Sequence, residues 1–307
     1  MKGVVCAVLG AACWGISGVC VQFVQQHSAA TSPFITCARD LIAALIFVGF
    51  ALLVPRLRQG VKAIMADPRA RRASAAFGAF LFASQITYIY AIQETNAGTA
   101  TVLQSLSIAM ILVVTCVRAR RRPSAIEGAG LVCALGASWM IATQGSLTSL
   151  NLPIGGLVWG LLTAIAATMY IVFPGKLYAR FGSLPVVTCG FVFCALFVLV
   201  TWVGLSIFGL AGGPFEIPVM DVPSTIVLIV GVGMLGTFVA FMLYLYGVSK
   251  VGPVAGGMLG AVEPASATFV MAAWLGSAIS GADWLGLALM ICMIVLVSLP
   301  KRRSRKA

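Results

Sequence analysis

The sequence predicts an all-α integral membrane protein whose ten transmembrane helices form two inverted five-helix repeats. Three observations predict this fold: ten long apolar stretches, basic residues confined to every second gap between them, and self-similarity at an offset of 156 residues. The composition agrees, because 61% of the 307 residues are hydrophobic, 9% are charged and the mean hydropathy is +1.06. Long apolar stretches in such a chain are typical of transmembrane helices.

The length of the apolar stretches predicts helices that cross the bilayer. A helix rises about 1.5 Å per residue, so roughly 20 apolar residues cross a hydrocarbon core of about 30 Å. In chain order the predicted spans are 4–24, 33–54, 75–93, 98–117, 125–143, 155–178, 185–208, 224–249, 252–275 and 282–299. The first follows Lys2 as a signal peptide would, but Trp14 and Gln22 interrupt it and no small-x-small cleavage site follows. We therefore predict a mature helix there.

Basic residues predict the orientation, because Lys and Arg near the end of a span resist translocation. If the N-terminus is cytoplasmic, 19 of the 20 basic residues lie on the cytoplasmic side, and the exception is Arg39 inside the second span. The 19 are Lys2, Arg56, Arg58, Lys62, Arg69, Arg71, Arg72, Arg118, Arg120, Arg121, Arg122, Lys176, Arg180, Lys250, Lys301, Arg302, Arg303, Arg305 and Lys306. Both termini are thus predicted to be cytoplasmic, with a basic cytoplasmic tail at 301–307.

Several classes of protein are disfavoured by the same residues. The net charge of +12 follows from the topology and indicates contact with anionic lipid headgroups, not nucleic acid. All nine cysteines fall within apolar spans and the single histidine, His27, lies in an outer loop, so no metal site or cofactor is expected. No Gly-x-x-x-x-Gly-Lys-Ser/Thr loop occurs, which disfavours ATP-driven transport. With no catalytic residues recognisable, we expect that the protein is not an enzyme.

Sliding the chain along itself by 156 residues, without gaps, brings its halves into register. The matched residues are Trp14 with Tyr170, Phe82 with Phe238, Tyr88 with Tyr244, Tyr90 with Tyr246, Leu103 with Leu259, Ala109 with Ala265, Glu127 with Asp283, and Gly130-Leu131 with Gly286-Leu287. Because five spans is an odd number, the second half enters the membrane from the opposite side. Inverted repeats are typical of secondary transporters, whose substrate site lies near the midplane where the repeats meet.

Several motifs resemble those of a known family. The pair Trp14-Gly15, the Tyr-x-Tyr segments at 88–90 and 244–246, and the pair Glu263-Pro264 resemble the EamA-type transporters of the drug/metabolite transporter (DMT) superfamily. The resemblance implies two EamA repeats, at 1–144 and 152–300, in a bacterial inner-membrane carrier that often exports amino acids or other small metabolites. The first half departs from the pattern, with Ser107-Ile108 where the second has Glu263-Pro264.

Polar and aromatic residues within the spans predict a substrate cavity, since polar groups in a bilayer are costly unless they face a protein interior or water. Helical spacing puts Gln85 with Tyr88 on one face and Thr101 with Gln104 on another. The aromatic candidates, which could take flat rings or organic cations, lie on the first, sixth and eighth spans. Together with Ser17 and Thr163, which share their helix faces, these candidates are Trp14, Trp159, Tyr170, Phe241 and Tyr244. The alternative roles are interhelical hydrogen bonding and interfacial anchoring.

Two charged residues within spans are further candidates. Glu263 lies near the predicted midplane and could carry a proton or bind a substrate amine, because burial disfavours its charged form. Alternatively it stabilises backbone freed by Pro264, which cannot donate to Gly260. Arg39, beside Asp40, could pair locally, snorkel to the surface or contact an anionic group of a substrate.

We therefore expect a secondary transporter that works by alternating access, as a monomer or weak dimer. We favour the prediction of an exporter of small metabolites such as amino acids or related amines. An importer or exchanger of the same fold is the alternative. A non-transporting scaffold would not need the polar midplane residues. A channel would need a continuous polar lining or a charged ring.

Overall fold

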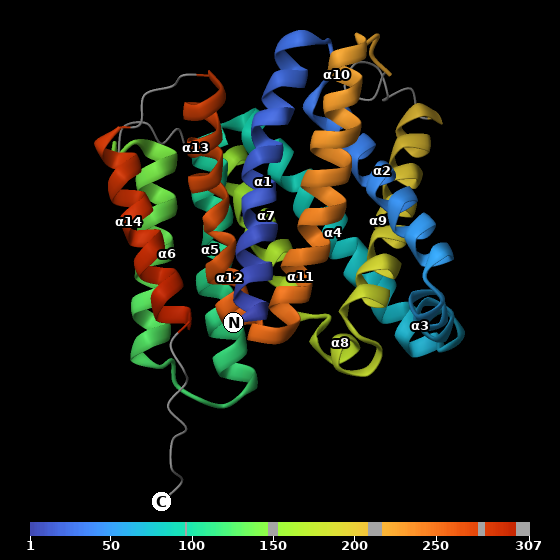
Figure 1. Cartoon of the computed structure of the whole chain (residues 1–307), viewed down its shortest axis with the longest axis horizontal. Coiled ribbons are helices and arrows are strands. Elements are labelled where there is room, and N and C mark those ends of the chain that lie inside the picture. Colours follow the sequence, from blue (N-terminus) through green and yellow to red (C-terminus); the bar gives the residue numbers. More distant parts are fainter. Residues whose placement is uncertain (96, 147–152, 208–216, 276–279, 299–307) are drawn as a thin grey trace, which may run out of the picture.

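The computed structural model describes residues 1–95, 97–146, 153–207, 217–275 and 280–298, and the regular elements in these ranges are all helices (Figure 1). Ten of the described segments are long and apolar enough to cross a membrane. These are Lys2–His27, Pro33–Leu53, Pro68–Glu94, Thr99–Arg118, Ala125–Thr143, Ile154–Phe181, Ser183–Gly204, Val222–Val251, Pro253–Trp274 and Gly281–Ser298. The prediction of an all-α membrane protein with ten spans is confirmed. The predicted tail at 301–307 lies outside the described residues.

The first half contains five spans and one short helix. The spans are α1 (Lys2–His27), α2 (Ser32–Leu53), α4 (Pro68–Glu94), α5 (Ala97–Arg118) and α6 (Ala125–Thr143), and α3 (Pro55–Ala66) joins α2 to α4. Helix α4 begins before the predicted residue 75, because the Asp67 carboxylate accepts hydrogen bonds from the backbone N–H groups of Arg69 and Ala70 at 2.9 and 3.3 Å. Helix α6 begins with a capping box between Ser124 and Glu127.

The second half departs from five simple helices. It contains α7 (Ile154–Val172), α8 (Gly175–Phe181), α9 (Ser183–Ile207), α10 (Val222–Ile226), the π-helix η1 (Val227–Val239), α11 (Ala240–Val251), α12 (Pro253–Gly260), α13 (Val262–Leu275) and α14 (Gly281–Ser298). The eighth span therefore combines α10, η1 and α11. The ninth is broken at Ala261, between α12 and α13, and Pro264 contributes because it lacks the N–H that would bond to Gly260.

Helices of the two halves interleave, so that α1 lies beside α11 and α13 in Figure 1 although they come from opposite ends of the sequence. Helix α1 packs against η1, α11 and α13, and its counterpart α7 packs against α4 and α5. Likewise α2 packs against η1 while its counterpart α9 packs against α4, and α6 pairs with α14. Each of these contacts between helices has a counterpart formed by the corresponding helices of the other half, as two inverted repeats require.

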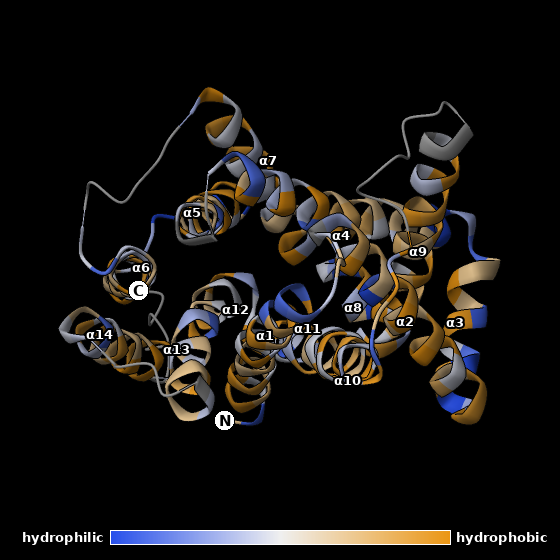
Figure 2. Ribbon diagram, turned by 90° about the horizontal axis from the view of Figure 1, so that it is seen from above, coloured by the Kyte–Doolittle hydropathy of each residue, from blue (hydrophilic) through white to orange (hydrophobic). Residues whose placement is uncertain are grey.

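One end of the bundle carries most of the described basic residues. Helix α1 begins and α14 ends there, and α3 and α8 lie there too, at the bottom of Figure 1. We call it the basic end. At this end Arg180 of α8 donates to Asp67 at 2.7 Å and so ties α8 to the junction of α3 and α4. Seen along the helices in Figure 2, hydrophobic residues cover the outer faces of the spans as well as the contacts between them, as a lipid-facing surface requires.

Candidate functional site

A cavity of about 70 Å³ lies where the two halves meet. Its walls come from α1, α5, α6, α7, α11 and the break between α12 and α13. Six of the residues that the sequence singled out line it together, namely Trp14, Thr101, Gln104, Tyr170, Tyr244 and Glu263. The cavity is therefore polar and aromatic, and it draws on both halves.

The 156-residue offset predicts the walls of this cavity better than the polar pattern does. Six pairs of residues related by the offset line it: Trp14 with Tyr170, Thr101 with Gly257, Gln104 with Gly260, Ser105 with Ala261, Ser107 with Glu263, and Ile108 with Pro264. The first half contributes hydroxyl and amide side chains from α5, whereas the second contributes glycines and one carboxylate. The approximate symmetry thus defines the place of the cavity, and the departures from it define its chemistry.

Glu263 is the acidic residue of the cavity. It lies in the first turn of α13, directly after the helix break, where the helix dipole favours negative charge. Among the described residues its half-buried carboxylate makes no hydrogen bond and no ion pair, although its backbone oxygen accepts a bond from Ser266 at 2.8 Å. A carboxylate held this way can accept a proton or bind a cationic group that enters the cavity.

Aromatic rings form one wall beside Glu263. The ring of Trp14 lies 4.8 Å from that of Phe241 and 4.5 Å from that of Tyr244. Phe241 does not line the cavity but supports this wall from behind, and its ring is 6.2 Å from that of Tyr170. The Tyr244 hydroxyl donates to the carbonyl of Gly256 at 2.9 Å, which fixes its ring against α12. Ring faces near a carboxylate favour cations.

Tyr88 connects the cavity to a second polar group. Its hydroxyl lies 2.9 Å from that of Thr101, which lines the cavity. The charges of both Glu263 and Arg39 act on the Tyr88 hydroxyl, and they attract each other although the two side chains do not touch. Tyr88 thus contacts the cavity wall through Thr101 without lining the cavity itself.

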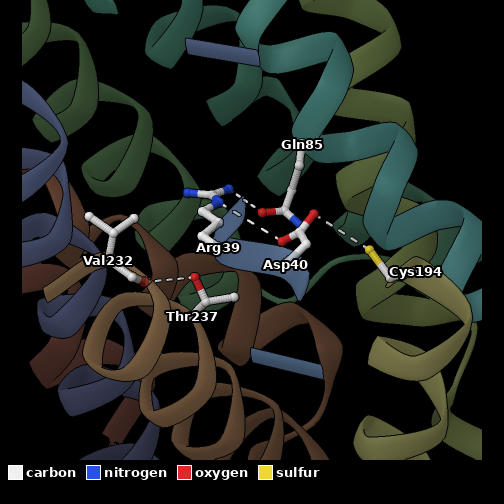
Figure 3. A network of polar contacts seen from close by, with 6 residues as sticks. All are labelled: Arg39, Asp40, Gln85, Cys194, Val232 and Thr237. Atoms are coloured by element: carbon white, nitrogen blue, oxygen red, sulfur yellow. Dashed lines mark hydrogen bonds and ion pairs between the residues drawn. The ribbon is translucent and has the colours of Figure 1, made fainter. Parts of the chain in front are cut away.

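Arg39 belongs to a buried network between α2, α4 and α9, drawn in Figure 3. The amide of Gln85 donates to both carboxylate oxygens of Asp40, at 2.8 and 3.0 Å, and accepts a bond from Arg39. Arg39 Nε lies 3.9 Å from Asp40, and the Cys194 thiol lies 3.6 Å from the same carboxylate. Asp40 has 0% of its surface exposed, whereas the Arg39 side chain retains 24%. Of the alternatives from the sequence, the structure shows local pairing.

Sequence reasoning missed the importance of Asp40 in this network. It treated Gln85 as a candidate for the cavity wall, but Gln85 joins the charges of Arg39 and Asp40 instead. The available signal was an acidic residue inside an apolar span, where an ionisable group needs a partner.

Three other candidates lie outside the cavity. Ser17 is buried against η1, where a Cβ added to Gly236 would come within 1.9 Å of its hydroxyl oxygen. The ring of Trp159 stacks on that of Tyr90 at 5.0 Å. Thr163 donates to Thr87 at 2.9 Å across the contact of α7 with α4. Helical spacing identified their faces but not the helices that cover those faces.

The described residues hold no group of three or more His, Cys, Asp or Glu side chains that could bind a metal ion. What they do hold is a small polar cavity at the meeting of two inverted repeats in a ten-span bundle. This arrangement is typical of membrane transporters built from inverted repeats.

Comparisons with known proteins agree. The model of the EamA-like transporter family matches residues 1–143 and 154–299, so the chain belongs to that family. It is 31% identical over 306 residues to a protein of Salmonella typhimurium named "Uncharacterized inner membrane transporter YicL", with 100% of this chain and 98% of the relative covered. A solved structure titled "Crystal structure of protein" shares the fold, with a TM-score of 0.78, 16% identity and 99% of each chain covered. The chain is a multi-pass membrane transporter of the EamA type, and its substrate is a small molecule.

Proposed function

We propose that this transporter exports small metabolites such as amino acids or related amines, and that the cavity lined by Glu263 is its substrate site. The observation that carries the proposal is the Glu263 carboxylate, which faces the cavity without a hydrogen bond or ion pair from any described residue. An unpaired carboxylate in a membrane protein interior is costly unless it takes up a proton or a cationic partner. A substrate amine or a coupling proton meets that need.

The surroundings of Glu263 favour an organic cation over a bare metal ion. Trp14, Tyr170 and Tyr244 present aromatic rings to the cavity, which suits an ammonium group through cation–π contact. Gln104 and Ser107 offer polar groups for the rest of a small solute. An amino acid or related amine, which joins an ammonium group to polar groups, fits this combination of carboxylate, rings and polar side chains.

Alternating access follows from the same architecture. The two repeats interleave around the cavity, so rocking one against the other would open it to each side in turn. Loading Glu263 with either a proton or the substrate amine would couple the two fluxes. Import or exchange of the same substrates would use the same site and differ only in the gradient that drives it.

We place both termini in the cytoplasm of a bacterial cell whose inner membrane holds the protein. The support is the positive-inside rule applied to the basic end. The named relative is itself described as an inner membrane transporter.

A metabolite screen tests the proposal. Cells that overexpress the protein and cells that lack it are compared for extracellular and intracellular amino acids and amines, and the strongest hits are tested for uptake into inside-out vesicles. Export of one or more amines or amino acids by the overexpressing cells is expected, together with their uptake into the vesicles. Hits confined to anions or to apolar compounds without an amine would contradict it.

A further inference from the structure

A second cavity lies between the cavity lined by Glu263, which we call the central cavity, and the basic end. It is a cleft of about 500 Å³ between α5, α6, α12 and α14. Apolar side chains such as Val254 and Val297 line most of it, while Arg121 and Glu127 form an ion pair of 2.6 Å at its rim. We call it the inner cleft. The charged rim lies at the basic end, and the apolar walls run from there toward the central cavity.

Only a thin layer of protein separates the inner cleft from the central cavity. On α12, Gly257 lines the central cavity and its neighbour Met258 lines the inner cleft. On α5, Ile108 lines the central cavity and Thr115 lines the inner cleft, which leaves about two helical turns between them. Ile111 lies within those two turns, and both Ile111, at 0% exposed, and Met258, at 1%, are fully buried.

Glycines allow these two side chains to close the layer. A Cβ placed on Gly257 would lie 2.8 Å from the Ile111 Cδ1 atom, so Ile111 rests directly on the α12 backbone. A Cβ placed on Gly130 of α6 would lie 3.0 Å from the Met258 sulfur, so Met258 rests directly on α6. Ile111 and Met258 thus pack between α5, α12 and α6, and such side chains can move without unfolding a helix.

The repeat symmetry shows that this closure is one-sided. The counterparts of Ile111 and Met258 at the offset of 156 residues are Ala267 and Val102, on the opposite side of the central cavity. Both are smaller than their mates, and both are half-buried rather than fully buried. The bulky, fully buried pair therefore occurs only toward the basic end.

We propose that Ile111 and Met258 form the gate between the central cavity and the inner cleft, and that the inner cleft is the path between this gate and the membrane face at the basic end. The proposal rests on the proposed function, since it assumes that solutes pass through the central cavity. It adds the side chains that separate this cavity from one face of the membrane. Removing either side chain should leave the central cavity open to that face.

Thiol labelling tests the gate without requiring a known substrate. Ser138 lines the central cavity and Ala255 lines the inner cleft, so Ser138→Cys reports the cavity and Ala255→Cys identifies the face that leads to the cleft. Vesicles of either orientation are treated with 2-aminoethyl methanethiosulfonate, with free cysteine sealed on the far side as a scavenger. Mass spectrometry of the modified peptides then resolves each introduced cysteine from the native ones.

We expect Met258→Ala to speed labelling of Ser138→Cys at least tenfold, and only from the face that labels Ala255→Cys. Ile111→Ala should do the same, which keeps the test open if one variant does not fold. Met290→Ala is the matched control, because Met290 is equally buried, at 3% exposed, but lines neither cavity. Unchanged labelling in both gate variants, equal acceleration by Met290→Ala, or acceleration only from the other face would overturn the proposal. A protein with this gate that moved no amine would refute the proposed substrate class and leave the gate standing.

Discussion

At the scale of single residues, the same kind of side chain has different roles in and beside the cavity. Gln85 makes hydrogen bonds to both Arg39 and Asp40, whereas Gln104 lines the cavity and makes no hydrogen bond to any described residue. Burying two opposite charges is favourable only when their remaining hydrogen-bonding groups are satisfied. Gln85 is therefore expected to support the fold, and Gln104 to serve the solute.

Replacing each glutamine by leucine should separate these roles. Gln85→Leu leaves Asp40 without its amide donor, so we expect the free energy of unfolding in detergent to fall by about 1–3 kcal/mol. Gln104→Leu should keep the thermal midpoint of the wild type but impair transport of the amine found by the screen. Thermal unfolding and vesicle uptake, measured on both variants, check this. Equal loss of stability in the two variants would be inconsistent with the assignment.

At this scale, sequence reasoning identified six of the sixteen residues that line the cavity. Spacing alone could place Trp14 and Gln104 on inward faces, because polar and large aromatic residues are conspicuous in apolar spans. It could not show that Ser17 faces η1 or that Trp159 stacks on Tyr90, since both depend on which helix packs over a given face. Gly257 and Gly260 were also missed, because a cavity wall made of backbone leaves no polar side chain to notice.

At the scale of helices, close packing of α1 against α13 holds the wall that carries Trp14 and Glu263. A Cβ added to Gly15 would lie 1.9 Å from the Ser266 hydroxyl oxygen and 2.4 Å from the backbone oxygen of Glu263. The backbones can approach this closely only because position 15 has no side chain. Ser266 reinforces the contact by donating to the carbonyl of Ala12 at 3.1 Å.

A pair of glycine substitutions in α1 tests this contact. Gly15→Ala should force α1 away from α13, lower the free energy of unfolding by about 1–3 kcal/mol and reduce transport. Gly18→Ala is the matched control, since a Cβ there meets nothing within 4 Å, and it should be neutral or slightly stabilising. Thermal midpoints of the two purified variants give the answer. A harmless Gly15→Ala would show that α1 and α13 do not meet as described.

The Asp67 cap at the start of α4 should make the thermal stability of the protein depend on pH. Backbone donors from Ala70 and Arg69, and then Arg180, favour the ionised form of Asp67 and hold its pKa below the ordinary value of 3.8. A lowered pKa means that the stabilisation is complete above the unfolded value and is lost as the pH falls through the folded value. Asp67→Asn should therefore have a lower thermal midpoint than the wild type at pH 7, with the difference shrinking below about pH 4. A difference that stayed constant with pH would argue against a charged cap.

The hydropathy pattern predicted the existence of all ten spans but not the form of two of them. A strongly apolar segment has the same hydropathy whether its hydrogen bonds follow α or π spacing, so η1 was not predicted. Helix η1 is distinguished by its tertiary contacts. Gly231 packs against Cys20 and Gly233 against Ile42, at distances that leave no room for a side chain on either glycine. The break at Ala261 had a signal in Pro264, although the exact position depends on how α12 packs.

At the scale of the whole molecule, the two halves build the cavity jointly. Every helix that lines the cavity packs against helices of the other half, and the cavity wall consists largely of repeat-related pairs. A site built between two inverted repeats suits the alternating access proposed above, because each repeat can move relative to the other. The sequence predicted this through the offset and the distribution of Lys and Arg, since both are global properties that survive local changes.

The orientation of the bundle can be checked with a reporter. A fluorescent protein fused to the C-terminus should be fluorescent and inaccessible to external protease, because the basic end is expected to face the cytoplasm. A fusion of alkaline phosphatase at the same point should be inactive. Active phosphatase would reverse the assignment of sides, and with it the direction in which the inner cleft opens.

The most direct test of the central claim, that Glu263 makes the shared cavity a transport site, is proton-coupled flux in proteoliposomes. Glu263→Gln removes the charge but keeps the shape, and Glu94→Gln makes the same change at an exposed carboxylate outside the cavity. With the amine or amino acid found by the screen, Glu263→Gln should abolish flux driven by a pH gradient at an unchanged folded yield, while Glu94→Gln should retain it. Flux through Glu263→Gln equal to that of the wild type would contradict the claim.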